Sequence, residues 1–262
     1  MQLANQVAII TGASSGIGEA ITRCFAAEGA RVVLAARSEE KLRGLAAELG
    51  AERALVVPTD VADSGQVERL VAQTVERFGG VDVLVNNAGI GLLGRMEETD
   101  WEHFRRMWEV NFFGLVRLTR AALPYLKKRK GVVVNISSVA GKLALPYMSG
   151  YCATKSALNA FSTGLRMDVA QAGVRVVVIC PGRVRTRFHA NVYREGENLP
   201  GVFRAEKRRY TGITAEEVAR ATLRAVRRNR REIVVPWTLR LLVGFRALFP
   251  AFTDRMLVRL FR

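Results

Sequence analysis

The stretch Thr11-Gly12-Ala13-Ser14-Ser15-Gly16-Ile17-Gly18 decides the fold of this chain. It follows the apolar run Val7-Ala8-Ile9-Ile10, which predicts a buried first strand, and it opens into residues 19–28, whose helical composition stops at Gly29. A strand that turns through glycines into a helix gathers backbone N–H groups and the positive end of the helix dipole at one point. That point suits a pyrophosphate, although an ordinary tight turn gives the same pattern when the motif stands alone.

The three glycines have separate uses in such a turn. Gly12 takes the turn itself, Gly16 lets the backbone come close to the phosphates, and Gly18 lets the helix lie against the sheet. The predicted contacts of this loop with a dinucleotide are Gly12, Ser14, Ser15, Gly16, Ile17 and Gly18.

Length and composition indicate a single large domain. The 262 residues contain no Pro/Ser-rich linker, low-complexity segment or internal repeat. We expect no signal peptide, because the first strand begins a few residues after Met1, and no membrane span, because no stretch is long and uncharged enough. Cys24, Cys152 and Cys180 have apolar neighbours and no metal-ligand spacing, which favours a reduced cytoplasmic setting and no metal site.

The net charge of +16 is concentrated near the C-terminus. Residues 183–262 carry 19 Lys and Arg against 7 Asp and Glu, whereas the 182 residues before them carry 21 against 17. The basic character is therefore a surface feature of the last third of the chain and does not belong to the cofactor half.

The end of the predicted second strand, Arg31–Ala36, bears on the choice of cofactor. A dinucleotide-binding fold meets the adenosine ribose there, and an acidic residue would hydrogen-bond the 2′-hydroxyl of NAD. This chain has Ala35-Ala36-Arg37-Ser38, so no carboxylate repels a 2′-phosphate and Arg37 is placed to pair with one. We therefore predict NADP rather than NAD. The alternative is that Arg37 is a solvated residue and Ser38 merely caps the helix 39–49.

The ends of two further predicted strands carry polar side chains. Asp60 follows the strand 54–58, where it would accept a hydrogen bond from the adenine amino group or serve only as a turn residue. Asn86-Asn87-Ala88-Gly89 follows the strand 81–85, where it would hold the adenosine and pin neighbouring backbone, or form an ordinary turn. The predicted cofactor contacts from these two strand ends are Asp60, Val61, Asn87, Ala88 and Gly89.

Capping boxes mark three helix starts. They are Asp63 to Gln66, Thr99 with Glu102, and Thr214 to Glu217. The helix that Thr99 heads runs toward Lys127 and contains Asn111 among apolar neighbours, where a buried amide needs partners. Asn111 is either a satisfied core amide or the holder of a catalytic water.

A tyrosine and a lysine follow the fifth predicted strand. That strand, 131–137, has an apolar centre and ends at Ser138, at the edge where open parallel sheets place their ligands. Tyr151 and Lys155 are four residues apart, so on a helix they share a face, and the ammonium would lower the pKa of the phenol. Tyr151 would then donate a proton to a carbonyl oxygen that Ser138 orients, although a Tyr/Lys pair alone is more often a surface pair.

In order and spacing, the motifs 11–18, 86–89, Asn111, Ser138 and Tyr151–Lys155 resemble the short-chain dehydrogenase/reductase family over nearly the whole chain. The resemblance implies that Asn111, Ser138, Tyr151 and Lys155 form a catalytic tetrad. Tyr151 would be the acid/base and Ser138 would position the carbonyl. Lys155 would also bind the nicotinamide ribose, and Asn111 would hold a water that links Lys155 to solvent. The hydride would pass from the nicotinamide to the carbonyl carbon.

The resemblance continues past the sixth predicted strand. The family has Pro-Gly and a nearby threonine there, and the matching residues imply nicotinamide contacts from Pro181, Gly182, Val184 and Thr186. Residues 187–212 are polar and irregular where the family places its variable substrate lid, and a solvated loop is the alternative. Residues 90–93, 143–147 and this lid would line an apolar pocket, which favours a hydrophobic carbonyl substrate.

Residues 236–262 lie beyond the predicted core. In one helix, seven apolar residues would share a side, and Pro250 would break or kink that helix. The seven are Leu241, Phe245, Leu248, Phe249, Phe252, Met256 and Leu260. With the surrounding arginines this face would lie in an anionic membrane interface, or else cover the pocket or contact another subunit. No reading-head motif accompanies the arginines, so we do not expect nucleic-acid binding.

The sequence therefore predicts a doubly wound α/β fold of Rossmann type over residues 1–235, with an amphipathic extension over 236–262. The mainly parallel sheet would have about seven strands and helices on both faces. The predicted activity is NADPH-linked reduction of a hydrophobic aldehyde or ketone, or the reverse oxidation, by a homodimer or homotetramer. The main alternative is an NAD-linked, hydroxysteroid-like secondary-alcohol dehydrogenase. The others are a non-catalytic dinucleotide-binding protein and a membrane-surface scaffold.

Overall fold

A computed structural model describes residues 1–196, 199 and 212–261 of the chain. Its centre is a seven-stranded sheet in the order β11-β7-β6-β4-β1-β2-β3, in which every pair of neighbouring strands is parallel. The strands are β1 (Val7–Thr11), β2 (Arg31–Ala36), β3 (Ala54–Pro58), β4 (Val83–Asn86), β6 (Val132–Ile136), β7 (Arg175–Pro181) and β11 (Glu232–Val235). The predicted doubly wound fold is confirmed. The strand order reverses between β1 and β4, where such sheets place their ligands.

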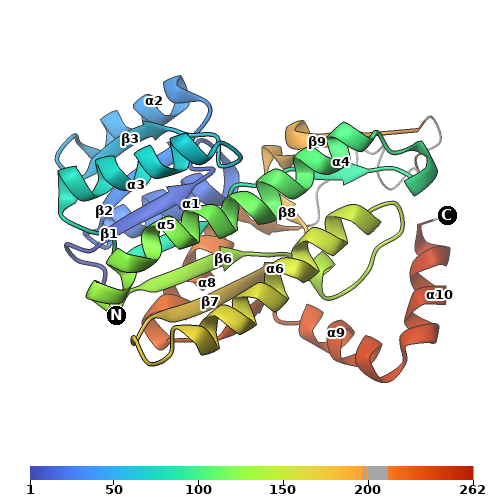
Figure 1. The fold of residues 1–262 in the computed structure, drawn as a ribbon. Coiled ribbons are helices and arrows are strands. Elements are labelled where there is room, and N and C mark those ends of the chain that lie inside the picture. The colour runs from blue at the N-terminus through green and yellow to red at the C-terminus, as the bar shows by residue number, and fades with distance from the viewer. Residues whose placement is uncertain (197–198, 200–211, 262) are drawn as a thin grey trace.

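Helices cover both faces of the sheet (Figure 1). The main helices are α1 (Gly16–Ala27), α2 (Glu39–Leu49), α3 (Ser64–Phe78), α4 (Trp101–Trp108), α5 (Gly114–Arg129), α6 (Ser149–Asp168), α8 (Ala215–Arg228), α9 (Leu239–Leu248) and α10 (Pro250–Leu260). Side chains of α1, α2 and α8 form one core cluster with the sheet, and those of α3, α5 and α6 form the cluster on the opposite face.

Successive side chains of β1 point to opposite faces of the sheet, so this one strand contributes to both core clusters. Ala8 and Ile10 belong to the cluster of α1, α2 and α8, whereas Val7 and Ile9 belong to the cluster of α3, α5 and α6. All four side chains are buried. A strand that is covered on both faces needs an uninterrupted apolar run, which is the pattern that the sequence shows there.

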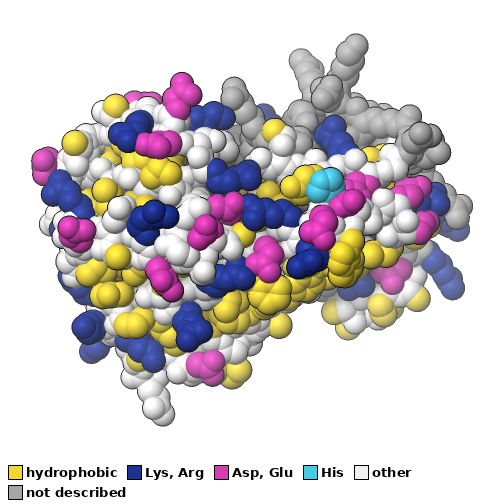
Figure 2. Space-filling view, turned by 45° about the horizontal axis from the view of Figure 1, so that its top comes forward, with side chains coloured by type: hydrophobic (Ala, Val, Ile, Leu, Met, Phe, Trp, Pro, Cys, Tyr) yellow, Lys and Arg dark blue, Asp and Glu magenta, His cyan; other side chains and the backbone are white. Residues whose placement is uncertain are grey.

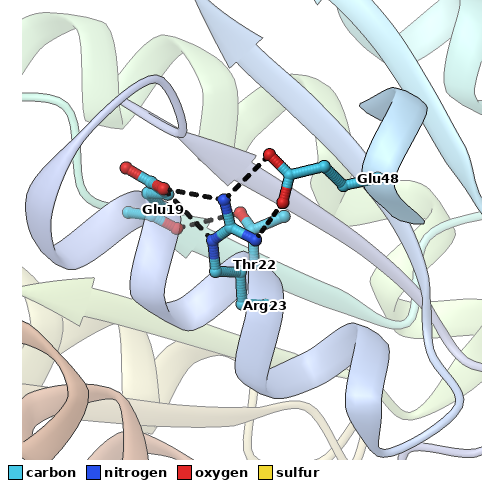
Figure 3. Close-up of polar contacts among 5 residues, drawn as sticks. Glu19, Thr22, Arg23 and Glu48 are labelled. Carbon is cyan, nitrogen blue, oxygen red and sulfur yellow. Dashed lines mark hydrogen bonds and ion pairs between the residues drawn. The ribbon is translucent and has the colours of Figure 1, made fainter. Parts of the chain in front are cut away.

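An exposed ion-pair group joins the first two helices. Arg23 on α1 pairs with Glu19 at 3.1 Å and with Glu48 on α2 at 2.6 Å (Figure 3). The hydrogen bond from Arg23 is the main cause that lowers the pKa of the Glu48 carboxyl. Because these side chains are solvated, the pairs contribute little stability and chiefly favour one orientation of α1 against α2.

Two of the three predicted helix caps are confirmed and one is wrong. Asp63 caps α3, and Thr214 caps α8 in a complete capping box. The cap of α4 is Asp100, whose carboxylate accepts from the N–H of His103 at 3.0 Å. Thr99 does not cap it, because its hydroxyl donates to a carbonyl of the preceding turn. Ser38 stands at the N-cap of α2, without a side-chain capping bond.

Two small strand pairs lie outside the main sheet, in segments for which no strand was predicted. Strand β5 (Gly91–Leu93) pairs with β9 (Val192–Arg194), and β8 (Val184–Arg185) pairs with β10 (Ile213–Thr214). A short 3-10 helix, η4 (Arg187–Asn191), precedes β9. The rest of the predicted lid, residues 197–198 and 200–211, lies outside the described residues.

The C-terminal extension contains two helices where one was considered. The break predicted at Pro250 is confirmed, and Pro250 is the first residue of α10, a position at which the missing N–H costs nothing. The seven apolar side chains of the predicted face are all exposed. In the described part of the chain, each helix is too short or too polar to cross a bilayer.

Candidate active site

The loop between β1 and α1, which we call the glycine cradle, contains three glycines whose backbone angles or close neighbours disfavour any side chain. Gly12 and Gly16 have left-handed φ angles of +65° and +57°, which favour glycine. A Cβ atom on Gly18 would collide with the carbonyl oxygen of Gly12 and lie 2.6 Å from Asn87 Nδ2. A Cβ atom on Gly16 would lie 3.1 Å from Thr186. With the N-terminus of α1 behind it, this loop fits the pyrophosphate of a dinucleotide.

Asn87 pins the glycine loop, as predicted for the end of β4. Its Nδ2 donates to the carbonyl oxygens of Thr11 at 2.9 Å and Gly12 at 3.4 Å. In return, the hydroxyl of Thr11 accepts from the backbone N–H groups of Asn87 and Ala88 at 2.9 and 3.0 Å. The ends of β1 and β4 are therefore locked together at the position where the strand order reverses.

Asn86 has a different role from Asn87, although the two are adjacent in sequence. It is buried, and its Nδ2 donates to Thr119 Oγ1 at 3.0 Å and to Asn135 Oδ1 at 2.9 Å. Asn135 in turn donates to Ser162 Oγ at 2.8 Å. This buried polar chain links β4 and β6 to α5 and α6 behind the site, so Asn86 supports the structure.

The adenosine end of the site lies at β2 and β3, which are neighbours in the sheet. Arg37 follows β2 and is exposed. The Asp60 carboxylate, after β3, accepts from the guanidinium of Arg106 and from the N–H of Ala62, the latter at 3.0 Å. Asp60 is thus held in one orientation by a partner on α4, while its bond to adenine stays a prediction.

Asn111 lies in a π-helical turn between α4 and α5, η2 (Glu109–Phe113), so the single long helix predicted there is interrupted. Its Oδ1 accepts from the N–H of Ile90 and its Nδ2 donates to the carbonyl of Ile90, both at 2.9 Å. A further bond runs from Nδ2 to Thr154 Oγ1 at 3.2 Å. Asn111 is therefore a satisfied buried amide, and a π-turn is a frequent mark of functional sites.

Tyr151, Ser138 and Lys155 converge at the carboxyl end of β6. Ser138 is the N-cap of the short 3-10 helix η3 (Val139–Gly141), and its hydroxyl acts to lower the pKa of the Tyr151 phenol. Lys155 Nζ lies 5.8 Å from the centre of the Tyr151 ring and donates to the carbonyl of Ile136 at 3.1 Å. A Cβ atom on Gly89 would lie 3.8 Å from Lys155 Nζ and 3.3 Å from Asn111 Oδ1, so the predicted tetrad is one cluster.

Burial dominates the ionisation of this pair. It raises the pKa of Tyr151 to about 12, against the opposing effect of the Ser138 hydroxyl. It also lowers the pKa of Lys155 to about 8. The expectation that the lysine lowers the phenol pKa is therefore wrong for these residues by themselves, because desolvation of the phenolate raises this pKa and Lys155 is not among the groups that shift it.

The end of β7 brings the predicted nicotinamide contacts to the same edge. Gly182 follows Pro181 and donates its N–H to the carbonyl of Val235 at 2.7 Å. Thr186 accepts from the N–H of Phe188 at 3.3 Å and lies against Gly16. The residues predicted for the nicotinamide end thus face the loop predicted for the pyrophosphate.

Three side chains near the site were not predicted from the sequence. Arg106 holds Asp60, Thr154 holds Asn111, and the Phe188 ring lies against Tyr151. Thr154 stands between Tyr151 and Lys155 in the predicted helix, which is the only signal that singles it out. Arg106 and Phe188 come from segments far from their partners in sequence, so periodicity and local motifs do not reveal them.

Comparison with known proteins shows the family to which the chain belongs. A sequence profile described as short chain dehydrogenase matches residues 6–197. The chain belongs to this family. Among the relatives of this short-chain dehydrogenase is "Dehydrogenase/reductase SDR family member 7B" of Bos taurus, which is 39% identical over 240 residues, 88% of this chain and 73% of the relative.

Solved structures agree with the family and differ in cofactor. A short-chain dehydrogenase/reductase of Burkholderia phymatum, solved in complex with NAD, is 30% identical, with 94% of each chain covered and a TM-score of 0.86. An alcohol dehydrogenase of Thermococcus sibiricus, complexed with 5-hydroxy-NADP, is 33% identical over 88% of this chain and 95% of that one, with a TM-score of 0.76. The chain is therefore an oxidoreductase of a family whose structures bind NAD or NADP.

Proposed function

We propose that this short-chain dehydrogenase reduces a hydrophobic aldehyde or ketone with NADPH, or runs the reverse oxidation. The observation that carries the proposal is the convergence of Tyr151, Ser138, Lys155 and Asn111 at one edge of the sheet, next to the glycine cradle. A scaffold or a dinucleotide sensor would not need a phenol, a hydroxyl and an ammonium gathered beside that cradle.

Each member of the tetrad has a separate task in the proposed reduction. A bound nicotinamide supplies the hydride. Tyr151, whose pKa burial keeps high, holds its proton at neutral pH and delivers it to the carbonyl oxygen. The Ser138 hydroxyl would hydrogen-bond the same oxygen and fix its position. Lys155 would bind the ribose hydroxyls and favour the phenolate left by proton transfer, and Asn111 would hold a water that returns a proton to this pair.

Preference for NADP rests on Arg37. The guanidinium is exposed directly after β2, and residues 35–38 contain no carboxylate that would repel a 2′-phosphate. The other predicted cofactor contacts, at 12–18, 60–61, 87–89 and 181–186, would serve NAD equally. Since the similar structures include complexes with NAD, with NADH and with 5-hydroxy-NADP, similarity does not support a preference for NADP.

An apolar substrate is supported by the surroundings of Tyr151. Its ring belongs to a cluster with Ile90 and Leu92, and Leu145 and Phe188 pack on that cluster. Residues 94–97, Pro146, Tyr147 and Ser149 line a cavity of about 350 Å³, so the predicted wall 143–147 borders open space, whose lining also includes the charged side chains of Arg95 and Glu97. The apolar cluster around Tyr151 is what favours a hydrophobic carbonyl compound.

We also propose that the enzyme is a homodimer or homotetramer and that it works in the reducing environment of the cytoplasm. Trp101 and Phe113 are exposed, and ring contacts through Phe104, Trp108 and Phe112 connect them along α4 and η2. Figure 2 shows a band of hydrophobic side chains across this side of the molecule, which suits contact with a second copy. The three cysteines are unpaired, which suits a reducing compartment.

The decisive experiment measures nicotinamide absorbance with a panel of aliphatic, aromatic and steroid carbonyls and NADPH. Tyr151→Phe should lower kcat by about 10²–10⁴-fold for the best substrate, while the Kd of NADPH stays unchanged. Tyr125→Phe on α5, which removes a hydroxyl remote from the tetrad, is the matched control and should keep full activity. Unchanged turnover in Tyr151→Phe would refute the proposed acid/base role.

A further inference from the structure

The helices α9 and α10 concentrate exposed apolar surface in one short segment. Of 13 large hydrophobic side chains that the described residues expose, nine lie between Trp237 and Leu260. They are Trp237, Leu241, Phe245, Leu248, Phe249, Phe252, Met256, Val258 and Leu260. Figure 1 shows α9 and α10 at the edge of the molecule, with a sharp bend between them. Single exposed apolar residues are ordinary, but a cluster of this size marks an interaction surface.

Helix α9 is apolar on two opposite sides. Leu239, Leu242 and Val243 pack inward on a core cluster of the sheet and α6, so the helix is anchored in the domain. Trp237, immediately before the helix, and Leu241, Phe245 and Leu248 recur at intervals of three or four residues and point to solvent. An anchored helix needs no second apolar side to fold, so the outer stripe is available for a partner.

The stripe continues around the corner into α10. The Phe245 ring lies 5.0 Å from the Phe249 ring and 5.9 Å from the Phe252 ring, which forms an aromatic cluster at the bend. Phe252, Met256 and Leu260 then follow at intervals of four, while Thr253 and Leu257 face inward and are buried. The exposed rings and aliphatic chains therefore form a continuous surface.

The charges beside this surface are almost all positive. Arg240, Arg255 and Arg259 are exposed and form no ion pair with another described residue. The one acid of the segment, Asp254, pairs with Arg246 at 3.5 Å. A twofold contact between two copies of this surface would bring arginines against arginines. An acidic surface would complement them.

We propose that the α9–α10 segment docks on the surface of an anionic lipid bilayer. Its rings and aliphatic side chains would enter the boundary between headgroups and acyl chains, and Arg240, Arg255 and Arg259 would meet lipid phosphates. Neither helix is long enough to cross a bilayer, so the segment lies in the interface. Trp237 suits this depth because its ring is apolar with one polar N–H.

Docking would also bring the proposed active site to the lipid. A Cβ atom on Gly182 would collide with Leu239, so α9 begins against the predicted nicotinamide contacts. The cluster beneath α9 includes Val139 and Leu143, which closely follow Ser138. Resting on the proposed function, this arrangement favours carbonyl substrates that partition into membranes over water-soluble ones.

The test is co-sedimentation of the full chain with vesicles of phosphatidylcholine alone or mixed with phosphatidylglycerol. We expect binding to the mixed vesicles, weakened by high salt, and little binding to phosphatidylcholine. We expect two double variants, Phe249→Ser/Phe252→Ser and Arg255→Glu/Arg259→Glu, to bind the mixed vesicles much more weakly than the wild type. In the arginine variant, the loss should be about fivefold or more for each arginine removed. Met167→Ser, which removes an exposed apolar side chain on α6, is the matched control and should bind like the wild type.

Several results would overturn the docking proposal. They are absence of wild-type binding, equal binding to both vesicle types, and unchanged binding in both segment variants. Loss of self-association in sedimentation velocity for Phe249→Ser/Phe252→Ser, with unchanged vesicle binding, would assign the surface to a second copy. Thermal stabilisation by NADPH, measured on every variant, reports folding and cofactor binding separately. A failure of membrane docking is thereby distinguishable from a failure of the proposed enzyme function.

Discussion

The ring of Phe188 lies 6.2 Å from the ring of Tyr151, centre to centre, at an interplanar angle of 56°. Phe188 belongs to η4, the first part of the predicted lid, and a Cβ atom on Gly91 would lie 3.2 Å from it. The phenol is only 8% exposed beneath these neighbours. In the proposed reaction, the Phe188 ring would border the path of a carbonyl compound to Tyr151.

Phe188→Ala tests this relationship. Removing the ring takes away an apolar wall beside the proposed acid, so we expect KM for the best hydrophobic carbonyl to rise by about tenfold or more. Phe188→Leu keeps much of the apolar volume and should restore most of the loss. The Kd of NADPH, measured in parallel, should be unchanged in both variants. An equal rise of KM in the two variants would contradict a role for the apolar wall.

Two glycine-to-alanine changes of the same size should have opposite effects. At Gly18 the new methyl would collide with the Gly12 carbonyl, so we expect a loss of stability and of NADPH binding. At Gly44, inside α2, no atom lies within 4 Å of the added methyl, and stability should rise by about 0.5–1 kcal/mol. Urea unfolding and NADPH titration measure both. NADPH binding by Gly18→Ala at the wild-type level would refute the cradle.

Much of the fold was predictable because its signals are local. The apolar runs of β1 and β6, the glycine loop and the cap at Thr214 each depend on a few consecutive residues, and the structure has them where the sequence indicates. The cap of α4 was misassigned because Thr99 and Asp100 are adjacent and both are good caps. Only the backbone geometry shows which side chain reaches the free N–H.

The interior of the site was harder to predict because its contacts are distant in sequence. Asn111 was expected in a regular helix, yet its clamp on Ile90 lies in a π-turn that no periodicity indicates. The pKa of Tyr151 was expected to fall, because sequence spacing shows the nearby cation and does not show how completely the phenol is buried. Burial depends on the packing of several segments together.

Lys155 should make stability rise with pH in the alkaline range. Burial lowers its pKa in the folded state to about 8 from a reference value of 10.5, so between these values the unfolded chain binds more protons than the folded chain. Unfolding free energy should therefore rise relative to Lys155→Met by up to about 1.4 kcal/mol per pH unit from pH about 8 to 10. Below that range the two curves should run parallel.

Above pH about 10 the buried phenol acts in the other direction. The folded state keeps the proton of Tyr151 up to a pKa of about 12, whereas the unfolded chain loses it near 10, so stability should fall as pH rises. Tyr151→Phe should remove the part of this fall that the phenol causes and leave the rise from Lys155 intact, while the buried thiol of Cys180, whose pKa is also raised to about 12, keeps its own contribution in both proteins. Urea unfolding at several pH values measures both slopes. Parallel curves for wild type and Lys155→Met over the whole range would show that Lys155 is not desolvated.

Arg37→Asp should separate the two nucleotides. If Arg37 binds the 2′-phosphate, the change replaces an attraction with a repulsion and should weaken NADPH by about 10–100-fold. NADH should bind as before or better, because an acidic residue at this strand end hydrogen-bonds the ribose hydroxyls. Lys41→Asp, which makes the same charge change on exposed α2, is the matched control and should affect the two nucleotides equally. Equal losses of NADPH and NADH in Arg37→Asp would make Arg37 a solvated residue and remove the support for NADP.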